Sequence, residues 1–596
     1  MTAASSPNEA KRNPGPPPPH SAALHAGYDL AGRRAALDPV TVEVIRRRLV
    51  AIADEVDVNI TRTAFSPYIY EYKDYAVGIV DHRGDLICQC TAAMPVFVAD
   101  VMRAAIQDGL DIYGAADLHE GDIVINNYAG VIGQHLNNMA MYTPIHAPDA
   151  GGQSTLIGFM VVVMHWIDVG GRDVGSTSKF ATDIFQEGIQ FRTVKLRSHG
   201  EPVREIYRMI EHNTRFPVEM MGDINSQIGG CLMGRDEVAG LARRYGVDTF
   251  RGALATIWDQ SEAASRAAIR AIPDGTYTAE GVLDDDGLNP GSLPCRITVI
   301  VEGDEMTVDL SELPREVNAP MNCGRFGGGE TVSRLAFRYL ILPEGDANEG
   351  TFRPLKLVLP DGTIVSARPT APMGSYNSAL PTLIDLVIRA LGPAMPDRVA
   401  GGHCGTFATL AFAGRRPESG AFWQCHDSGF GGWGALSGQD GPGPFRTMCH
   451  GDTRMIPVEV HEATYPFMIE GFELRTDSGG AGEFRGGLGL TRRYLMLTDC
   501  RMSTRFERTK CPAWGMHGGH DAQSGNVTIE AADGTTRHAL KDAVQLKAGD
   551  RVRIDTGGGG GFGDPHRRDR AKVREDVAKG FVSREAACRV YGLSEG

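Results

Sequence analysis

The chain has 596 residues, of which 42% are hydrophobic, so it is long enough for two to four domains around a large buried core. Its formal net charge of −14 argues against a nucleic-acid partner, because phosphate backbones are bound by concentrated basic surfaces. No run of 18 apolar residues occurs and the N-terminus has no apolar core, so neither a membrane span nor a secretory signal is expected. The 11 scattered cysteines are typical of reduced, mostly buried thiols, and we expect a cytoplasmic protein.

The predicted elements begin after a Pro/Ala/Ser-rich segment, residues 1–37, that we expect to be a disordered tail. Asp38 can cap a helix whose first turn suits Pro39, and apolar residues then recur every three or four positions to about Ile60. Residues 75–89 hold two short apolar runs around a turn, which predicts a β-hairpin.

Strands are expected next, followed by a long helical stretch and then by Gly/Asp/Pro-rich β sequence. Apolar spacing returns to that of a helix at 381–391, and strands with glycine loops follow residue 407. Two short helices should end the chain, the second capped by Ser583. The remaining expected segments are strands at 122–126, 139–145 and 155–164, helices within 203–271, and β structure over 275–350 with 297–301 paired to 306–310.

This mixture predicts an α+β protein, large and mixed, with β-rich central and C-terminal regions and glycine-rich loops. The expected division is a tail at 1–37, an N-terminal α/β region at 38–272 that carries the candidate site, a β-rich glycine-loop region at 273–565, and C-terminal helices at 566–596.

Two histidines follow or end predicted strands. His135 lies in Gln134-His-Leu-Asn-Asn138, and His165 ends the longest apolar strand, just before Asp168. Two imidazoles at the ends of neighbouring strands could converge on one metal ion, with Asp168 as a third ligand or as a group that orients a ligand. The alternative is that each histidine is a buried polar residue satisfied by the backbone.

Glycine-rich segments recur at 327–329, 429–434, 478–489 and 557–561. Such loops can cradle phosphate with backbone N–H groups, but none fits a P-loop or a dinucleotide-binding fingerprint. Tight turns are the favoured interpretation, and nucleotide binding by this chain alone is doubtful. Two polar clusters, 426–428 and 450–452, either line a substrate pocket or cap turns, and turn chemistry is favoured.

From Asp38 to Gly592 the sequence resembles the hydantoinase B/5-oxoprolinase/acetone carboxylase family, which includes N-methylhydantoinase B-like subunits. Several motifs carry this resemblance in the same order along the chain. They are the segments 38–45 (DPVTVEVI), 62–67 (RTAFSP), 135–138 (HLNN), 168–171 (DVGG), 184–188 (IFQEG), 457–459 (PVE), 477–489 (DSGGAGEFRGGLG) and 558–565 (GGGGFGDP).

The resemblance implies one part of a hetero-oligomeric enzyme. A partner subunit of the hydantoinase A type would bind ATP and phosphorylate a carbonyl-derived oxygen, and the B-type subunit would hold a divalent metal ion (Zn, Mn or Fe) for the second half-reaction. That step is hydrolysis of a cyclic amide such as a hydantoin or 5-oxoproline. The alternatives are a subunit of an acetone- or acetophenone-type ketone carboxylase, and a non-catalytic structural or substrate-binding subunit.

On this resemblance His135 and His165 would be metal ligands, Asp168 a ligand or base, and Asn138 a ligand or a hydrogen-bond donor to the substrate. Glu187 and Asp173 could contribute further carboxylates. The sequence departs from the family pattern at Asn138, where a carboxylate is common, at Tyr128 within an expected N-D-P motif, and at Phe97, where a histidine is often found. A site with neutral Asn138 would hold a hard divalent ion more weakly.

Overall fold

The structure, a computed structural model, describes residues 37–176 and 178–594, so the expected tail lies almost wholly outside the described residues. The first element, α1 (Pro39–Thr63), begins where the capping signal predicts, because the Asp38 carboxylate accepts hydrogen bonds from the backbone N–H groups of Val40 and Thr41. Its apolar face is buried from Val42 to Ile60.

A seven-stranded antiparallel sheet forms the centre of the N-terminal part, in the order β2-β1-β5-β4-β3-β6-β7. Its two longest strands, β4 and β5, are buried along most of their length. Their sequence is almost continuously apolar because other elements cover both faces of the sheet there. The strands are β1 (Tyr75–Asp81), β2 (Leu86–Gln89), β3 (Ile123–Asn126), β4 (Asn138–Pro148), β5 (Ser154–His165), β6 (Val194–Ser198) and β7 (Glu201–Pro202). The predicted hairpin at 75–89 and the three predicted strands after it are confirmed.

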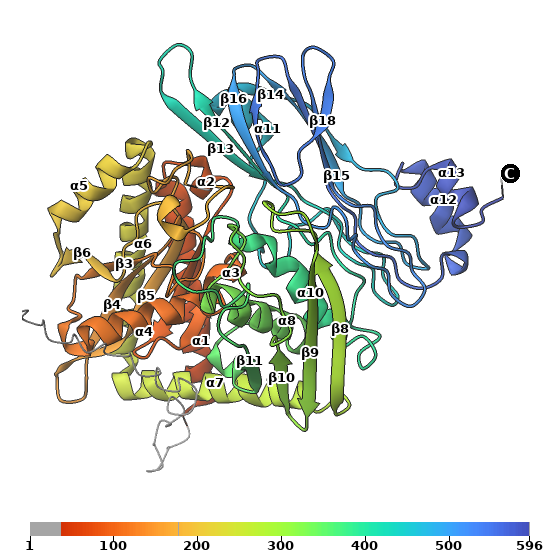
Figure 1. The fold of residues 1–596 in the computed structure, drawn as a ribbon. Helices are drawn as coiled ribbons and strands as arrows, with labels where there is room; N and C mark the ends of the chain where they lie inside the picture. Colours follow the sequence, from red (N-terminus) through yellow and green to blue (C-terminus); the bar gives the residue numbers. More distant parts are fainter. Residues whose placement is uncertain (1–36, 177, 595–596) are drawn as a thin grey trace, which may run out of the picture.

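Helices cover this sheet, and the predicted helical stretch at 203–271 is confirmed as three helices. The longest of them, α6 (Pro217–Tyr245), packs against β4, β5 and α1 (Figure 1). The others in this part are α2 (Pro67–Tyr70), α3 (Pro95–Val98), α4 (Val101–Tyr113), α5 (Arg204–Asn213) and α7 (Val247–Ile269).

The central part is a four-stranded sheet packed with helices. The predicted pairing across residues 302–305 is confirmed as β9 against β10, and the predicted helix at 381–391 is confirmed as α10 (Leu380–Ala390). The strands are β8 (Gly275–Leu283), β9 (Leu293–Glu302), β10 (Glu305–Asp309) and β11 (Leu355–Val358).

The prediction of β structure over 275–350 is wrong for one segment, because α8 (Thr331–Ile341) lies within it and is followed by the short α9 (Glu349–Phe352). Val332, Ala336 and Leu340 recur at helical spacing and are buried on one face of α8, which packs against α10. Glycines and prolines flank this short apolar pattern on both sides. Because such residues are typical of turns between strands, the sequence predicted β structure here instead of a helix.

Two further sheets enclose a second hydrophobic core in the C-terminal part, seen at the top of Figure 1. One sheet has the order β13-β12-β16-β19, and the other β14-β15-β20-β17-β18. Their strands are β12 (Thr409–Arg415), β13 (Phe422–Ser428), β14 (Phe467–Leu474), β15 (Leu490–Met496), β16 (Cys500–Arg505), β17 (Asn526–Glu530), β18 (Thr536–His538), β19 (Ala543–Leu546) and β20 (Arg551–Asp555). The helix α11 (Val458–Thr464) packs against β14.

The expected terminal helices are confirmed as α12 (Arg570–Ala578) and α13 (Arg584–Arg589), and Ser583 caps the second as predicted. The 11 cysteines are free thiols and nine of them are buried, in agreement with the sequence. Within the described residues, no helix combines the length and the apolar composition that a membrane span requires.

The glycine-rich segments pack against one another by their backbones. Gly559 donates to the carbonyl oxygen of Gly487, and Gly560 donates to that of Gly402. A methyl group on either glycine would lie within 1.9 Å of a neighbouring carbonyl oxygen, so only glycine permits these close approaches. This arrangement agrees with the structural interpretation of the glycine motifs rather than with phosphate-binding loops.

Candidate functional site

The two predicted histidines meet at the end of the large sheet. Asn138 is the first residue of β4 and His165 the last residue of β5, and these two positions are paired across the strands. His135, three residues before β4, brings its ring to 4.9 Å from the His165 ring, with the planes at 71°. The expectation that strand ends place these imidazoles together is confirmed.

Asn138 is held in a network of three side chains. Its carboxamide oxygen lies 2.8 Å from the Nε2 atom of His135, so that nitrogen carries the proton and donates it. Its amide nitrogen donates to the side-chain oxygen of Gln134 at 2.7 Å and to the hydroxyl of Tyr376 at 3.2 Å. Asn138 therefore fixes the tautomer of His135, and an amide is the group that can accept at one end and donate at the other.

Residues from the C-terminal part complete the site. His426, on β13, lies with its ring 6.0 Å from the His165 ring, and Tyr68 stacks on His165 at 5.5 Å. We call His135, His165, His426 and Tyr68 the histidine cluster. The interpretation of residues 426–428 as a turn is wrong, because they belong to a strand whose histidine faces the site.

A second histidine from the other polar segment lies nearby. The Tyr72 hydroxyl donates to Ser428, and its oxygen accepts from the Nε2–H group of His450, each at 2.8 Å. The Tyr72 ring lies edge-on to His426 at 6.3 Å. The tyrosines carried no motif in the sequence, and only their recurrence in Tyr68-Ile-Tyr-Glu-Tyr72, beside a family landmark, could have pointed to them.

Burial keeps the imidazoles neutral. It lowers the pKa of His165 to about 4 and, together with the neighbouring His165, holds the pKa values of His135 and His426 well below the ordinary value. Within the described residues, neither ring nitrogen of His165 has a hydrogen-bond partner, although the residue is only 2% exposed. A neutral imidazole with free nitrogens can take a proton or bind a ligand.

Two buried carboxyl groups in the described residues have raised pKa values. The backbone carbonyl of Asp74 accepts from the N–H of His165, and burial raises the pKa of the Asp74 carboxyl to about 7. Glu187 is fully buried, accepts from the backbone N–H groups of Met373 and Gly374, and has its pKa raised to about 8 by burial. Glu187 is a candidate carboxylate from its motif in the sequence, whereas nothing in the sequence singles out Asp74.

Asp168 makes different contacts from those expected. One oxygen accepts from the hydroxyl of Ser176 and from the guanidinium of Arg215, each at 2.8 Å, and the other accepts from the Arg215 backbone N–H. These bonds neutralise its charge and fix the loop after β5. The other candidate carboxylate of this loop, Asp173, is paired with Arg501.

The residues present do not fit the expected metal centre. No three His, Cys, Asp or Glu side chains in residues 37–176 and 178–594 are arranged to hold a metal ion, so the set His135, His165 and Asp168 is not assembled as a ligand group. Nε2 of His135 is bonded to Asn138. Phe97 is buried in α3, and Tyr128 packs under Arg192, so neither position supplies the missing ligand.

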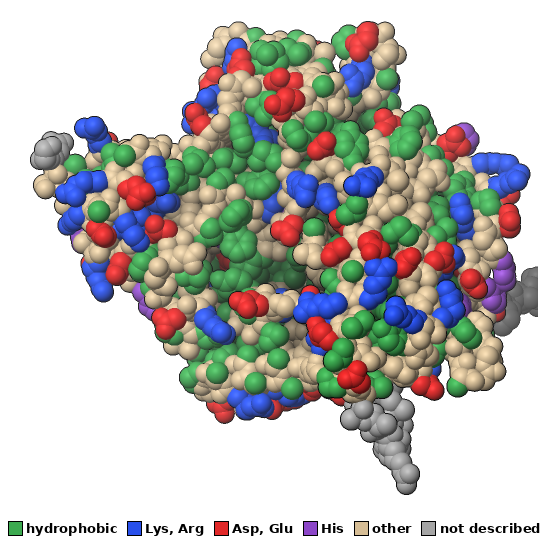
Figure 2. Space-filling model, turned by 180° about the vertical axis from the view of Figure 1, so that it is seen from behind, with side chains coloured by type: hydrophobic (Ala, Val, Ile, Leu, Met, Phe, Trp, Pro, Cys, Tyr) green, Lys and Arg blue, Asp and Glu red, His purple; other side chains and the backbone are tan. Residues whose placement is uncertain are grey.

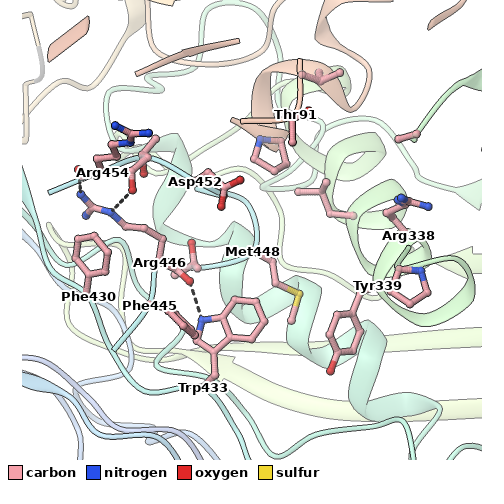
Figure 3. A pocket seen from close by; sticks show the side chains of 18 of the residues that line it. Thr91, Arg338, Tyr339, Phe430, Trp433, Phe445, Arg446, Met448, Asp452 and Arg454 are labelled. Carbon is pink, nitrogen blue, oxygen red and sulfur yellow. Dashed lines mark hydrogen bonds between the residues drawn. The ribbon is translucent and has the colours of Figure 1, made fainter. Parts of the chain in front are cut away.

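A cavity of about 1260 Å³ is lined by residues of the N-terminal, central and C-terminal parts. Most of its lining is apolar, with the rings of Tyr339, Phe430 and Trp433 among the side chains drawn in Figure 3. From behind, the surface of the molecule is hollowed near its middle, with hydrophobic side chains inside the hollow and charged ones around it (Figure 2). We call the cavity lined by Tyr339, Phe430 and Trp433 the apolar cavity.

Arg446 separates the apolar cavity from the histidine cluster. Its guanidinium lies between the rings of Phe430, at 4.0 Å, and Tyr72, at 4.8 Å, and donates to backbone carbonyls such as that of Arg454. Its own carbonyl accepts from the Trp433 indole N–H (Figure 3). Tyr72 therefore contacts Arg446, which lines the cavity, and also lies edge-on to His426 of the histidine cluster.

Comparisons with known proteins agree with this architecture. The caprolactamase subunit beta of Pseudomonas jessenii is 30% identical over 570 residues, which cover 94% of this chain and 96% of that one. The crystal structure of the ATP-dependent caprolactamase from that organism matches with a TM-score of 0.87 at 27% identity, over 94% of this chain and 97% of that one. A nucleotide-free acetone carboxylase structure has the same fold, with a TM-score of 0.86 at 20% identity over 93% of this chain and 80% of that one.

The family model described as hydantoinase B/oxoprolinase matches residues 38–565, which include every element from α1 to β20. The chain therefore belongs to the hydantoinase B/oxoprolinase family.

Proposed function

We propose that this chain is the B-type subunit of an ATP-dependent enzyme that hydrolyses a cyclic amide after an A-type partner has phosphorylated the ring carbonyl oxygen. The relatives named as a caprolactamase subunit and as an ATP-dependent caprolactamase support this reaction class. Amide resonance makes a lactam carbonyl a poor electrophile, and phosphorylation of its oxygen makes the ring carbon more open to attack by water. The C–N bond then breaks as the ring nitrogen takes up a proton, and hydrolysis of the resulting acyl phosphate gives the carboxylate and inorganic phosphate. The second step then needs a base for water at a site that excludes bulk solvent.

The observation that carries the proposal is the state of His165. It is buried and neutral, and neither ring nitrogen has a partner within the described residues. A neutral imidazole can remove a proton from attacking water, and Asn138 can orient His135 beside it. The neighbouring apolar cavity offers room for the hydrocarbon part of a lactam.

Metal assistance at His135 and His165 remains a prediction, and no step of the proposed reaction is routed through a metal ion. A test needs the chain reconstituted with its A-type partner. The complex, supplied with ATP, is given hydantoin, 5-oxoproline and caprolactam in turn, and ring-opened product and ADP are measured by mass spectrometry.

We expect one of these lactams to be opened, and His165→Ala to lower kcat by about 100-fold or more. His538→Ala, an exposed histidine on β18, is the matched control and should leave kcat unchanged. Formation of a 3-oxo acid that requires both bicarbonate and a ketone would contradict the hydrolase proposal and indicate a carboxylase. Full activity of both His165→Ala and His135→Ala would favour a non-catalytic subunit.

A further inference from the structure

A second cavity, of about 340 Å³, lies between the loop after β5 and one of the C-terminal sheets. One wall is the loop after β5, with Arg172, Asp173 and Lys179. The opposite wall is the sheet β13-β12-β16-β19, where Ala411 and Ser503 are small enough to leave the space open. We call this space the basic cavity.

Its carboxylates are already neutralised by other cations. Asp173 forms an ion pair with Arg501, and Asp499 forms one with Lys547 at 2.7 Å. Three cations remain along the lining without a carboxylate within ion-pair distance in the part of the chain that the structure describes: Lys179, which is buried, and Arg172 and Arg415, which are exposed at its rim. This local excess of positive charge stands out in a chain with a net charge of −14.

Lys179 is the most informative of the three. The residue is buried, and burial lowers the pKa of its ammonium group to about 8. Its nearest described ring is that of Phe180, with the ammonium 5.6 Å from the centroid. The carboxylates of Asp542 and Asp285 act on this ammonium group from beyond ion-pair distance and oppose only part of the shift. Burying a cation without an ion-paired carboxylate is costly, so an anionic ligand in the cavity would offset the cost.

The cavity and the histidine cluster share one face of the sheet. Ser503 pairs with Ala411, and Ala411 pairs with His426, so these side chains stand in one row across β16, β12 and β13. Arg505 lies two positions along β16 from Ser503, and its charge contributes to the lowered pKa values of His135, His165 and His426. An anion in the basic cavity would therefore lie beside the candidate catalytic groups.

We propose that the basic cavity binds a phosphoryl group, either as free phosphate or as part of a phosphorylated small molecule. Three unneutralised cations match a dianion better than a carboxylate, and guanidinium groups bind phosphoryl oxygens in pairs of hydrogen bonds. The inference rests on the proposed function only for the source of the phosphoryl group. In that function, the phosphoryl group belongs to the substrate that the partner subunit has phosphorylated.

The experiment uses the full chain without a partner, in a buffer free of phosphate and sulfate. Inorganic phosphate and phenyl phosphate are titrated separately and followed by calorimetry, with benzoate as the carboxylate probe. We expect saturable binding of one phosphate or phosphate ester, weakened about tenfold in Lys179→Gln and in Arg172→Gln. The tighter of the two probes distinguishes a free phosphate from an esterified one.

Lys572→Gln, which removes an exposed lysine on α12, is the charge-matched control and should leave the affinity unchanged. In the absence of ligand, Lys179→Gln should also raise the melting temperature, because it removes an unpaired buried cation. Phosphate should then stabilise the wild-type chain more than this variant.

Absence of saturable binding up to about 10 mM phosphate or phenyl phosphate would overturn the inference, as would equal affinities in the two cavity variants and the wild type. If benzoate binds as tightly as phenyl phosphate, the cavity is a carboxylate site and the proposed phosphoryl site is wrong. None of these measurements depends on turnover, so their outcome is separate from that of the lactam assay.

Discussion

Asn138 shows how one side chain can change the chemistry of a site while preserving its geometry. Its amide accepts from His135 and donates to Gln134 and Tyr376. An aspartate in this position could not donate to those two oxygens, but it would add a carboxylate beside two neutral imidazoles. Carboxylate and imidazole are the ligands that many divalent metal ions take in proteins.

We therefore expect Asn138→Asp to bind Zn²⁺ or Mn²⁺ at least about tenfold more tightly than the wild type, measured by competition with a chromophoric chelator. Asn213→Asp makes the same change at an exposed position and should leave the affinity unaltered. Equal affinity in Asn138→Asp and the wild type would mean that residue 138 does not control metal binding.

The contact between His135 and His165 could be predicted because it depends on local features, namely two strands that end in histidine and pair with each other. His426 could not be placed in the same way, since it lies more than 260 residues beyond His165 and reaches the site through the packing of a different sheet. Asp168 was overinterpreted for a related reason. Its motif was visible in the sequence, but its partner Arg215 lies 47 positions away.

At the scale of elements, the glycine-rich segments behave as backbone-packed layers. Gly560 is the clearest case, because a methyl group there would lie 1.8 Å from the carbonyl oxygen of Trp514. Neither the carbonyl nor the chain behind it can yield without breaking the hydrogen bond from Gly402 N–H to that same oxygen.

We expect Gly560→Ala to destabilise the C-terminal part by about 3 kcal/mol or more, or to prevent its folding, as measured by urea denaturation and soluble yield. Gly229→Ala is the matched control, because Gly229 is an exposed residue of α6 with nothing within 4 Å of an added methyl group. That substitution should be neutral or slightly stabilising. A Gly560→Ala chain as stable as the wild type would contradict the close packing.

The helices that could be predicted were those with an uninterrupted apolar period, such as α1 and α10. Composition misled the prediction for α8, where three glycines precede a helix whose apolar period spans only 11 residues. The arrangement of the glycine segments was also beyond sequence reasoning. Their recurrence was evident in the sequence. Which segment packs against which depends on contacts between residues far apart in the chain, such as Gly402 and Gly560.

At the scale of the whole molecule, the candidate site lies between two separate hydrophobic cores. One core runs from α1 through the central part, and the other fills the space between the two C-terminal sheets. Side chains from both parts form the histidine cluster, and the apolar cavity is lined from both as well. Sites at such boundaries are common, since two rigid bodies can position groups that neither holds alone.

Tyr72 links these two parts through its hydroxyl, which donates to Ser428 and is bonded to His450, while Arg446 covers its ring. Tyr72→Phe keeps the ring and its stacking but leaves two buried polar groups without their shared partner. We expect a loss of about 1–3 kcal/mol in the free energy of unfolding, measured by urea denaturation.

Tyr277→Phe tests whether this loss is specific to the boundary, because the Tyr277 hydroxyl donates to a single exposed carbonyl, that of Pro273. Its removal should cost less than about 0.5 kcal/mol, since water can replace the lost partner. If the contact also holds the site together, Tyr72→Phe should expose β13 (Phe422–Ser428) to proteolysis or hydrogen exchange more than Tyr277→Phe does. Equal protection of that strand in both variants would mean that the two cores are joined by packing alone, with the hydroxyl of Tyr72 serving only its immediate neighbours.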